Sequence, residues 1–105
     1  MDYLGEFEQI VMLAILRLGE AAYGMTIRKE ILEVAARPAS LGAVYTTLER
    51  LEDKGFLSTS IGEVTEERAG RAKKYFRVTG LGQSALKQAL KSTEAMKDGL
   101  VWEGA

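Results

Sequence analysis

Hydrophobic residues recur at three- and four-residue steps in the first half of the chain, which predicts amphipathic helices. The pattern places these helices at residues 6–18, 24–36 and 40–54. Ser40 can cap the third helix by accepting a hydrogen bond from its first turn, and Gly55 can end it in the left-handed conformation. Pro38 cannot continue a helix, so it separates the second helix from the third. The sequence therefore predicts two helices joined by a tight turn, which is a helix-turn-helix.

The first helix is apolar on every side from Ile10 to Leu16, and Gly19 closes it. A helix of this kind is covered on more than one face. The second cover could come from the other helices of the same subunit, but we expect a partner subunit. The second helix has Ile27, Ile31 and Val34 on its predicted buried side.

The third helix has two contrasting sides. One side is an apolar stripe made of Leu41, Val44, Leu48 and Leu51. The opposite side carries small, hydroxylic or basic residues, namely Ala43, Thr46, Thr47, Arg50 and Lys54. Small and hydroxylic side chains near a helix N-terminus suit close approach to DNA. Taken alone, the stretch fits equally well an amphipathic core helix whose outer face is smooth by chance.

After Gly55 the spacing of apolar residues changes to the alternation that is typical of strands. Strands are predicted at residues 56–61 and 72–78, with Phe76 and Val78 on one side of the second strand. A polar loop joins them into a hairpin. A helix-turn-helix followed by such a hairpin is the winged-helix arrangement, and the predicted fold class is mainly α with a small β part.

A last helix is predicted from about Gly80, with Thr79 as its cap and with apolar positions as far as Leu100. Little of the core is left for it to cover, so we expect it to pack against the first helix and a partner chain. This divides the chain into a DNA-binding domain at 1–79 and a dimerisation helix and tail at 80–105. The predicted dimer interface comprises Phe7, Ile10, Val11, Leu86, Leu90, Met96 and Leu100. Met96 and Trp102 are predicted to line an effector pocket at the dimer seam, although Trp102 could equally belong to a loosely packed tail.

Composition excludes several functions. At 105 residues the chain is predicted to be one compact unit, and it has no Cys and no His. The commonest general base, nucleophilic thiol and metal ligands are therefore missing, and no cofactor or enzymatic activity is expected. No apolar run reaches the roughly 18 residues of a membrane span. The N-terminus lacks the basic region of a secretion signal, so we expect a cytoplasmic protein.

The net charge of −1 does not by itself favour nucleic acid, but the bases are concentrated. The segment 68–77 contains Arg68, Arg71, Lys73, Lys74 and Arg77 and no acid. Basic side chains on a wing can bind phosphates or enter the minor groove. The predicted DNA-binding residues are Ser40, Ala43, Tyr45, Thr46, Thr47, Arg50, Arg71, Lys73 and Lys74. For Ser40 a capping role is the main expectation, Tyr45 could be plain core, and Arg50 could pair with an acid of its own helix.

Several of these residues together resemble the PadR family of bacterial transcriptional regulators. The resemblance lies in Tyr23-Gly24, Ser40 to Tyr45, Lys54-Gly55, and the run from Gly70-Arg71 through Lys74-Tyr75-Phe76 to Thr79. It implies a dimeric winged-helix repressor whose third helix enters the major groove and whose wing touches the backbone or the minor groove. In that family the C-terminal helix dimerises with the N-terminal one. Thr46 stands where many members have proline, and the C-terminal region is short.

We therefore predict a homodimeric regulator, a repressor by resemblance, that binds an inverted-repeat operator in double-stranded DNA. The alternative is a winged helix that binds another protein and has no role on DNA. A small-molecule effector is possible within the family, but nothing in the sequence selects one.

Overall fold

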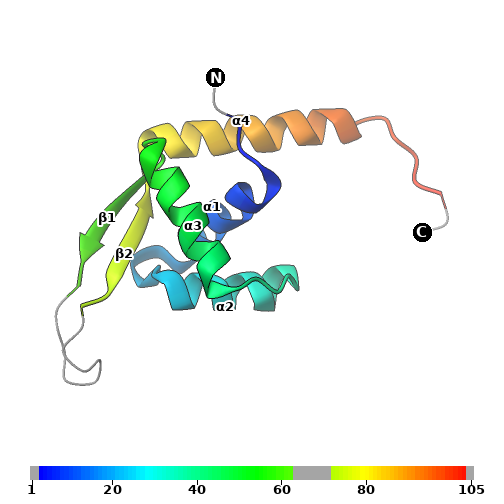
Figure 1. The fold of residues 1–105 in the computed structure, drawn as a ribbon. Coiled ribbons are helices and arrows are strands. Elements are labelled where there is room, and N and C mark those ends of the chain that lie inside the picture. The colour runs from blue at the N-terminus through cyan, green and yellow to red at the C-terminus, as the bar shows by residue number, and fades with distance from the viewer. Residues whose placement is uncertain (1–2, 63–71, 104–105) are drawn as a thin grey trace.

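The computed structural model describes residues 3–62 and 72–103, which form four α-helices and a two-stranded antiparallel sheet (Figure 1). The helices are α1 (Glu6–Leu18), α2 (Gly24–Ala35), α3 (Leu41–Asp53) and α4 (Gly80–Lys97). The strands are β1 (Leu57–Ile61) and β2 (Lys74–Val78), and a short 3-10 turn, η1 (Gly19–Ala21), follows α1. This element order confirms the predicted winged helix-turn-helix.

The helices begin and end where local chemistry allows. Ser40 Oγ accepts a hydrogen bond of 3.0 Å from the N–H of Ala43, and Thr79 caps α4 in the same way. Gly55 has a φ of +80°, as expected for the glycine that follows a helix. Helix α2 ends before Pro38, because Ala36 already takes a left-handed conformation with a φ of 51°.

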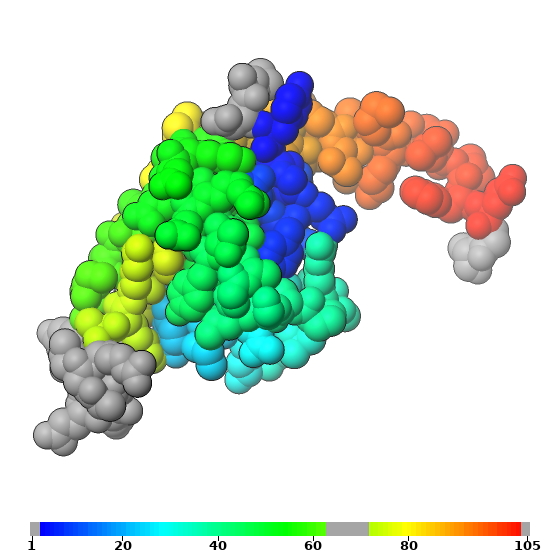
Figure 2. Space-filling view, viewed as in Figure 1, coloured from blue at the N-terminus to red at the C-terminus, as the bar shows by residue number. Residues whose placement is uncertain are grey.

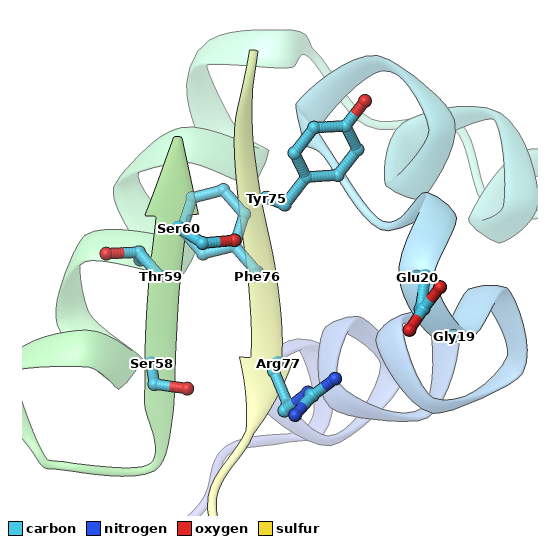
Figure 3. A pocket seen from close by; sticks show the side chains of 8 residues that line it. All are labelled: Gly19, Glu20, Ser58, Thr59, Ser60, Tyr75, Phe76 and Arg77. Atoms are coloured by element: carbon cyan, nitrogen blue, oxygen red, sulfur yellow. The ribbon is translucent and has the colours of Figure 1, made fainter. Parts of the chain in front are cut away.

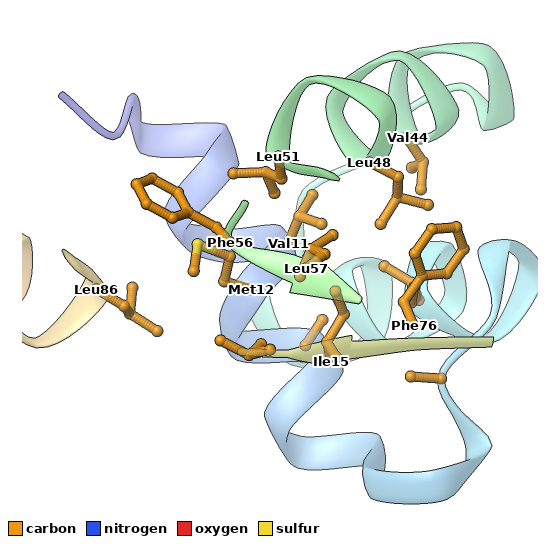
Figure 4. Close-up of a cluster of buried hydrophobic side chains, with 14 of the residues drawn as sticks. Val11, Met12, Ile15, Val44, Leu48, Leu51, Phe56, Leu57, Phe76 and Leu86 are labelled. Carbon is orange, nitrogen blue, oxygen red and sulfur yellow. The ribbon is translucent and has the colours of Figure 1, made fainter. Parts of the chain in front are cut away.

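The core lies where α1, α2, α3 and the sheet meet (Figure 4). Helix α1 is central, because Val11, Met12, Ala14 and Ile15 in its middle are all buried. The core side chains include Val11, Met12, Ile15, Ile27, Ile31, Val44, Leu48, Leu51, Phe56, Leu57, Phe76, Val78 and Leu86. Burial of these apolar side chains is the main force that holds α3 against the rest of the domain.

The sheet follows the predicted alternation. Leu57 pairs with Val78 and Thr59 with Phe76, and this face packs on the core. The other edge of β2 is not free, since the N–H of Phe76 donates a hydrogen bond of 2.9 Å to the carbonyl of Ala22. The connection between α1 and α2 thus meets β2 through an isolated β-bridge between Tyr23 and Tyr75, which the sequence pattern did not predict.

Helix α4 leaves the domain after its first half (Figures 1 and 2). Leu86 is buried against the body, whereas every described residue from Lys91 onward is exposed. The Cα radius of gyration is 15.6 Å, compared with about 13 Å for a compact domain of this length. The projecting half of α4 accounts for this elongation. No helix in residues 3–62 and 72–103 is both long and apolar enough to cross a membrane.

Three sequence predictions about packing were wrong, and so was one about the extent of the last helix. Val11 and Leu86 were assigned to a dimer interface, but they are 0% and 3% exposed and belong to the core of their own subunit. Val34, predicted on the buried side of α2, is 55% exposed because it lines an open groove between α1 and α2 rather than the closed core. Leu100 lies beyond α4, because the helix stops at Lys97 and Gly99 then turns the chain with a φ of +80°.

Candidate nucleic-acid interface

The outer face of α3 is the first part of the candidate interface. Ala43, Tyr45, Thr46 and Arg50 are all exposed on it. The acids of the helix, Glu49, Glu52 and Asp53, all lie in its second half, so its exposed N-terminal half carries no negative side chain. No carboxylate of the described residues forms an ion pair with Arg50, so the alternative of an intrahelical pair is not observed there.

Thr47 does not belong to this face, which corrects the sequence prediction. It is 5% exposed, and its hydroxyl donates a hydrogen bond of 2.9 Å to the carbonyl of Ala43. The physical reason is its spacing, because Thr47 lies three residues after Val44 and four before Leu51 and so shares their stripe. A hydroxyl bonded to its own helix can be buried without an unsatisfied donor.

Lys54 is also absent from the outer face. Its Nζ lies 2.9 Å from Glu8 Oε2, and the two side chains are 20% and 9% exposed. Burial alone would raise the pKa of Glu8, but the hydrogen bonds from Lys54 and from the N–H of Gly5, with the charges of Lys54 and Arg50, outweigh it. The net result is a pKa below the ordinary value of a glutamate. Lys54 therefore anchors the end of α3 to α1.

The ring of Tyr45 packs against the first residue of α2. Its side chain leans on Gly24, the first residue of α2, and the residue remains 44% exposed. A Cβ on Gly24 would lie only 2.5 Å from Tyr45 Cζ, so the ring can take this position only because residue 24 is glycine. The ring of Tyr45 is therefore not part of the core, and it does not extend freely into solvent either.

The two predicted DNA-binding lysines of the wing, Lys73 and Lys74, make different contacts. Lys73 Nζ lies 4.0 Å from the centre of the Tyr23 ring, as in a cation–π contact. Lys74 lies on the other side of the strand, where its Nζ is 3.4 Å from Glu52 Oε1 and 45% of the side chain is exposed. Arg71, the third predicted wing residue, lies outside the described residues, as does Arg68.

A helix whose exposed N-terminal half carries no acid, followed by a hairpin with basic residues, is the arrangement expected of a winged-helix DNA reader. Comparison with known proteins agrees. The sequence model of the transcriptional regulator PadR-like family matches residues 12–88. The chain belongs to this family. It is a PadR-like transcriptional regulator, and the resemblance drawn from its motifs is confirmed.

Solved structures of similar proteins support the same conclusion. A PadR-like transcription factor from Bacteroides fragilis has 29% identity and a TM-score of 0.75, with 88% of this chain and 84% of that chain covered. A PadR family regulator from Eggerthella lenta has 26% identity and a TM-score of 0.71, covering 90% and 81% of the two chains. A transcriptional regulator from Clostridium thermocellum has 25% identity and a TM-score of 0.73, covering 86% and 84%. No curated protein sequence gives a significant match.

Several hollows lie outside the α3 face of this PadR-like chain. One of about 360 Å³ lies on the solvent side of the sheet, next to η1 (Figure 3). It is lined by Gly19, Glu20, Ser58, Thr59, Ser60, Tyr75, Phe76 and Arg77. A groove of about 780 Å³ runs between α4 and the segment that precedes α1, and Tyr3 and Lys54 are among its lining residues. Both are open surface features with no cluster of buried polar groups.

The predicted effector pocket is not formed by this chain alone. Trp102 lines a hollow at the end of α4 together with Lys91, Glu94 and other residues, but Met96 does not line it. The two side chains are 71% and 80% exposed. The structure therefore does not bring the two predicted residues together in one cavity.

Sequence reasoning missed the contacts that hold the interface in place. The residues involved are Glu8 with Lys54, Gly24 with Tyr45, and Tyr23 with Lys73. Two of the three involve the dipeptide Tyr23-Gly24, which was noticed only as part of a motif. A glycine at the first position of a helix does not signal such a contact, since Gly80 also begins a helix and a Cβ there would meet nothing within 4 Å.

Proposed function

We propose that this regulator is a homodimeric, sequence-specific DNA-binding protein, and that it acts as a repressor in the cytoplasm. The observation that carries the proposal is the exposed N-terminal half of α3, where Ala43, Tyr45 and Thr46 stand clear of the core and no acid is present. Small and hydroxylic side chains permit close approach to base edges, and a threonine can bond a base or contact a thymine methyl. The positive end of the α3 dipole would add to this.

The wing supplies the second set of proposed contacts. Lys73 and Lys74 flank the start of β2, and Arg71 precedes them in the sequence. Basic side chains at this place would bind phosphates and would provide affinity that depends on salt but not on sequence. In this proposal α3 supplies discrimination between sequences, and the wing supplies a large part of the affinity.

Dimerisation is the third part of the proposal. The exposed apolar residues Leu90, Met96 and Leu100 lie on or beyond the projecting half of α4, and Phe7 and Ile10 are half-buried on α1. Exposed apolar side chains on a projecting helix favour a partner. Residues 1–79 would then bind DNA, and residues 80–105 would hold two copies with half-sites about one helical turn, roughly 34–36 Å, apart.

The test is a salt series of binding to a random-sequence duplex, measured by fluorescence anisotropy. We expect measurable affinity at about 50 mM salt and a steep loss as salt rises, because non-specific binding is mainly electrostatic. Selection from a random library would then yield an inverted repeat, and a reporter under that operator should be repressed. Absence of affinity at about 50 mM salt would contradict the proposal and favour a winged helix that binds another protein.

A further inference from the structure

Two residues of the α1–α2 connection and the start of α2 lie between the two elements proposed to contact DNA. Gly24 lies under the ring of Tyr45 from α3, and the ring of Tyr23 lies under the ammonium group of Lys73 from the wing. We propose that Tyr23 and Gly24 are positioning residues for DNA binding, which act through Tyr45 and Lys73. This inference rests on the proposed function.

The Gly24 contact is steric. A Cβ on residue 24 would lie 2.5 Å from Tyr45 Cζ and 2.9 Å from Tyr45 Cε1, which is closer than real contacts allow. The obstructing atoms belong to the far end of a side chain that is 44% exposed, so the ring can swing outward into solvent. An alanine at this position would therefore relocate the hydroxyl of Tyr45 without disturbing the core.

Stability gives no competing reason for the glycine. Gly24 is the first residue of α2, and its φ is not in the left-handed range. Alanine favours a helix over glycine at ordinary helical positions. The natural sequence therefore keeps a residue that is unfavourable for the helix, and the space that it leaves is filled by Tyr45.

The contact between Tyr23 and Lys73 is electrostatic, and it lies next to the contact between Gly24 and Tyr45. Tyr23 forms an isolated β-bridge with Tyr75, and the two rings meet edge to face with 5.6 Å between their centres. This fixes the Tyr23 ring against β2 and leaves one face for Lys73 Nζ, 4.0 Å from the ring centre. The contact holds Lys73, which directly precedes β2, against the residue that precedes Gly24.

The first experiment is a double-mutant cycle of Gly24→Ala and Tyr45→Phe. Affinity for the selected operator is measured by fluorescence anisotropy, and affinity for a random-sequence duplex of about 25 base pairs is measured beside it at low salt. We expect Tyr45→Phe to weaken binding by about three- to tenfold, as for loss of one hydrogen bond. Gly24→Ala should weaken it by at least as much, and the double variant should bind no more weakly than Gly24→Ala alone. Independent, multiplying effects of the two changes would overturn the proposal.

Gly80→Ala is the matched control. Gly80 is the first residue of α4, as Gly24 is of α2, but a Cβ there would meet nothing within 4 Å. This variant should bind DNA as the wild type does. Thermal unfolding of Gly24→Ala should occur at no lower temperature than in the wild type, which separates displacement of Tyr45 from misfolding.

The second experiment tests Tyr23 through the salt dependence. Lys73→Ala should lower the slope of log affinity against log salt by about 0.9, the value for one phosphate contact. Tyr23→Leu should lower the slope in the same direction and have no further effect when combined with Lys73→Ala, whereas Tyr23→Phe should preserve it. An unchanged slope in Tyr23→Leu, with Lys73→Ala effective, would overturn the role of Tyr23.

The outcomes also separate this proposal from the function on which it rests. If the wild type binds DNA but Tyr45→Phe has no effect, the role of Gly24 is overturned and DNA binding stands. If the wild type does not bind DNA at about 50 mM salt, both are overturned.

Discussion

Lys54 Nζ lies 2.9 Å from Glu8 Oε2, so the end of α3 is tied to the first turn of α1. Glu8 has a second task, because its Oε1 accepts a hydrogen bond of 2.8 Å from the N–H of Gly5 at the start of α1. One carboxylate therefore caps the central helix and also anchors the proposed recognition helix. The pair is well shielded from water, which distinguishes it from the exposed ion pairs that contribute little.

Replacing Glu8 with glutamine tests this anchor. Glutamine retains an acceptor for Gly5 but removes the charge that pairs with Lys54, and we expect the free energy of unfolding at pH 7 to fall by about 1–3 kcal/mol. The pKa of Glu8 is lowered in the folded state from an ordinary value near 4.5. The unfolded chain thus takes up the proton first, so the contribution of Glu8 is complete above about pH 4.5 and is lost as pH falls through the folded pKa.

The measurement is denaturant unfolding of both proteins between pH 7 and pH 3. The difference between wild type and Glu8→Gln should be constant at neutral pH and should shrink below about pH 4.5. A difference that persists unchanged into acid would show that the charge of Glu8 is not the source of the stabilisation.

Gly82→Ala should destabilise the fold. A Cβ on Gly82 would overlap the carbonyl oxygen of Phe56 and lie 3.0 Å from Val78 Cγ1, and the backbone atoms involved cannot swing aside as a side chain can. Such overpacking costs about 1–3 kcal/mol, and each kcal/mol lowers Tm by roughly 4–8 °C in a domain of this size. Thermal unfolding followed by circular dichroism measures it, with Gly80→Ala as the control that should leave Tm unchanged or slightly raised.

The two neighbouring threonines of α3 should behave differently on DNA. Thr46 is exposed, so Thr46→Val should reduce affinity for the selected operator by about 0.5–1.5 kcal/mol through loss of one hydrogen bond to DNA. Thr47→Val removes only a buried hydroxyl that bonds Ala43, and operator affinity should not change. Titrations of both variants against the operator and a scrambled duplex measure this. An equal loss in both variants would contradict the assignment of Thr47 to the core.

The projecting half of α4 should be required for dimerisation. Met96→Glu places a charge in the proposed seam, and we expect sedimentation equilibrium to show the mass falling from a dimer to the 11.5 kDa of one chain. Lys91→Glu is the control, because residue 91 lies on the opposite side of α4 from Leu86 and is also exposed. A dimer that survives Met96→Glu, or a wild type that is monomeric, would contradict the proposed seam.

The sequence predicted the elements well because their signals are local. The caps at Ser40 and Thr79 and the turn at Gly55 depend on a few neighbouring residues, and the structure has each of them. The alternation that buries Phe76 and Val78 is likewise a property of one strand.

The errors arose where distant segments decide. Thr47 is predicted on the exposed face of α3 because its hydroxyl is polar. Its burial depends instead on which elements α3 packs against. Val34 is predicted to be buried because it is apolar, but it faces an open groove between α1 and α2. The contact between Tyr45 and Gly24 joins two helices at a place where residue 24 has no side chain. The spacing of hydrophobic residues along the chain does not predict such a contact. These contacts follow from the tertiary arrangement rather than from local pattern.

The pairing of β2 with the backbone of Ala22 and Tyr23 has a consequence for self-association. Because Ala22 and Tyr23 meet the second side of β2 near Tyr75 and Phe76, the outer side of β1 is the longer open strand edge of the described hairpin. An open edge can recruit strands from other molecules and start aggregation. Here that edge is five residues long and contains Ser58, Thr59 and Ser60 at its centre. A short edge strand is one of the devices by which proteins limit such growth, so the small length of β1 restricts edge-to-edge pairing at this side of the described hairpin.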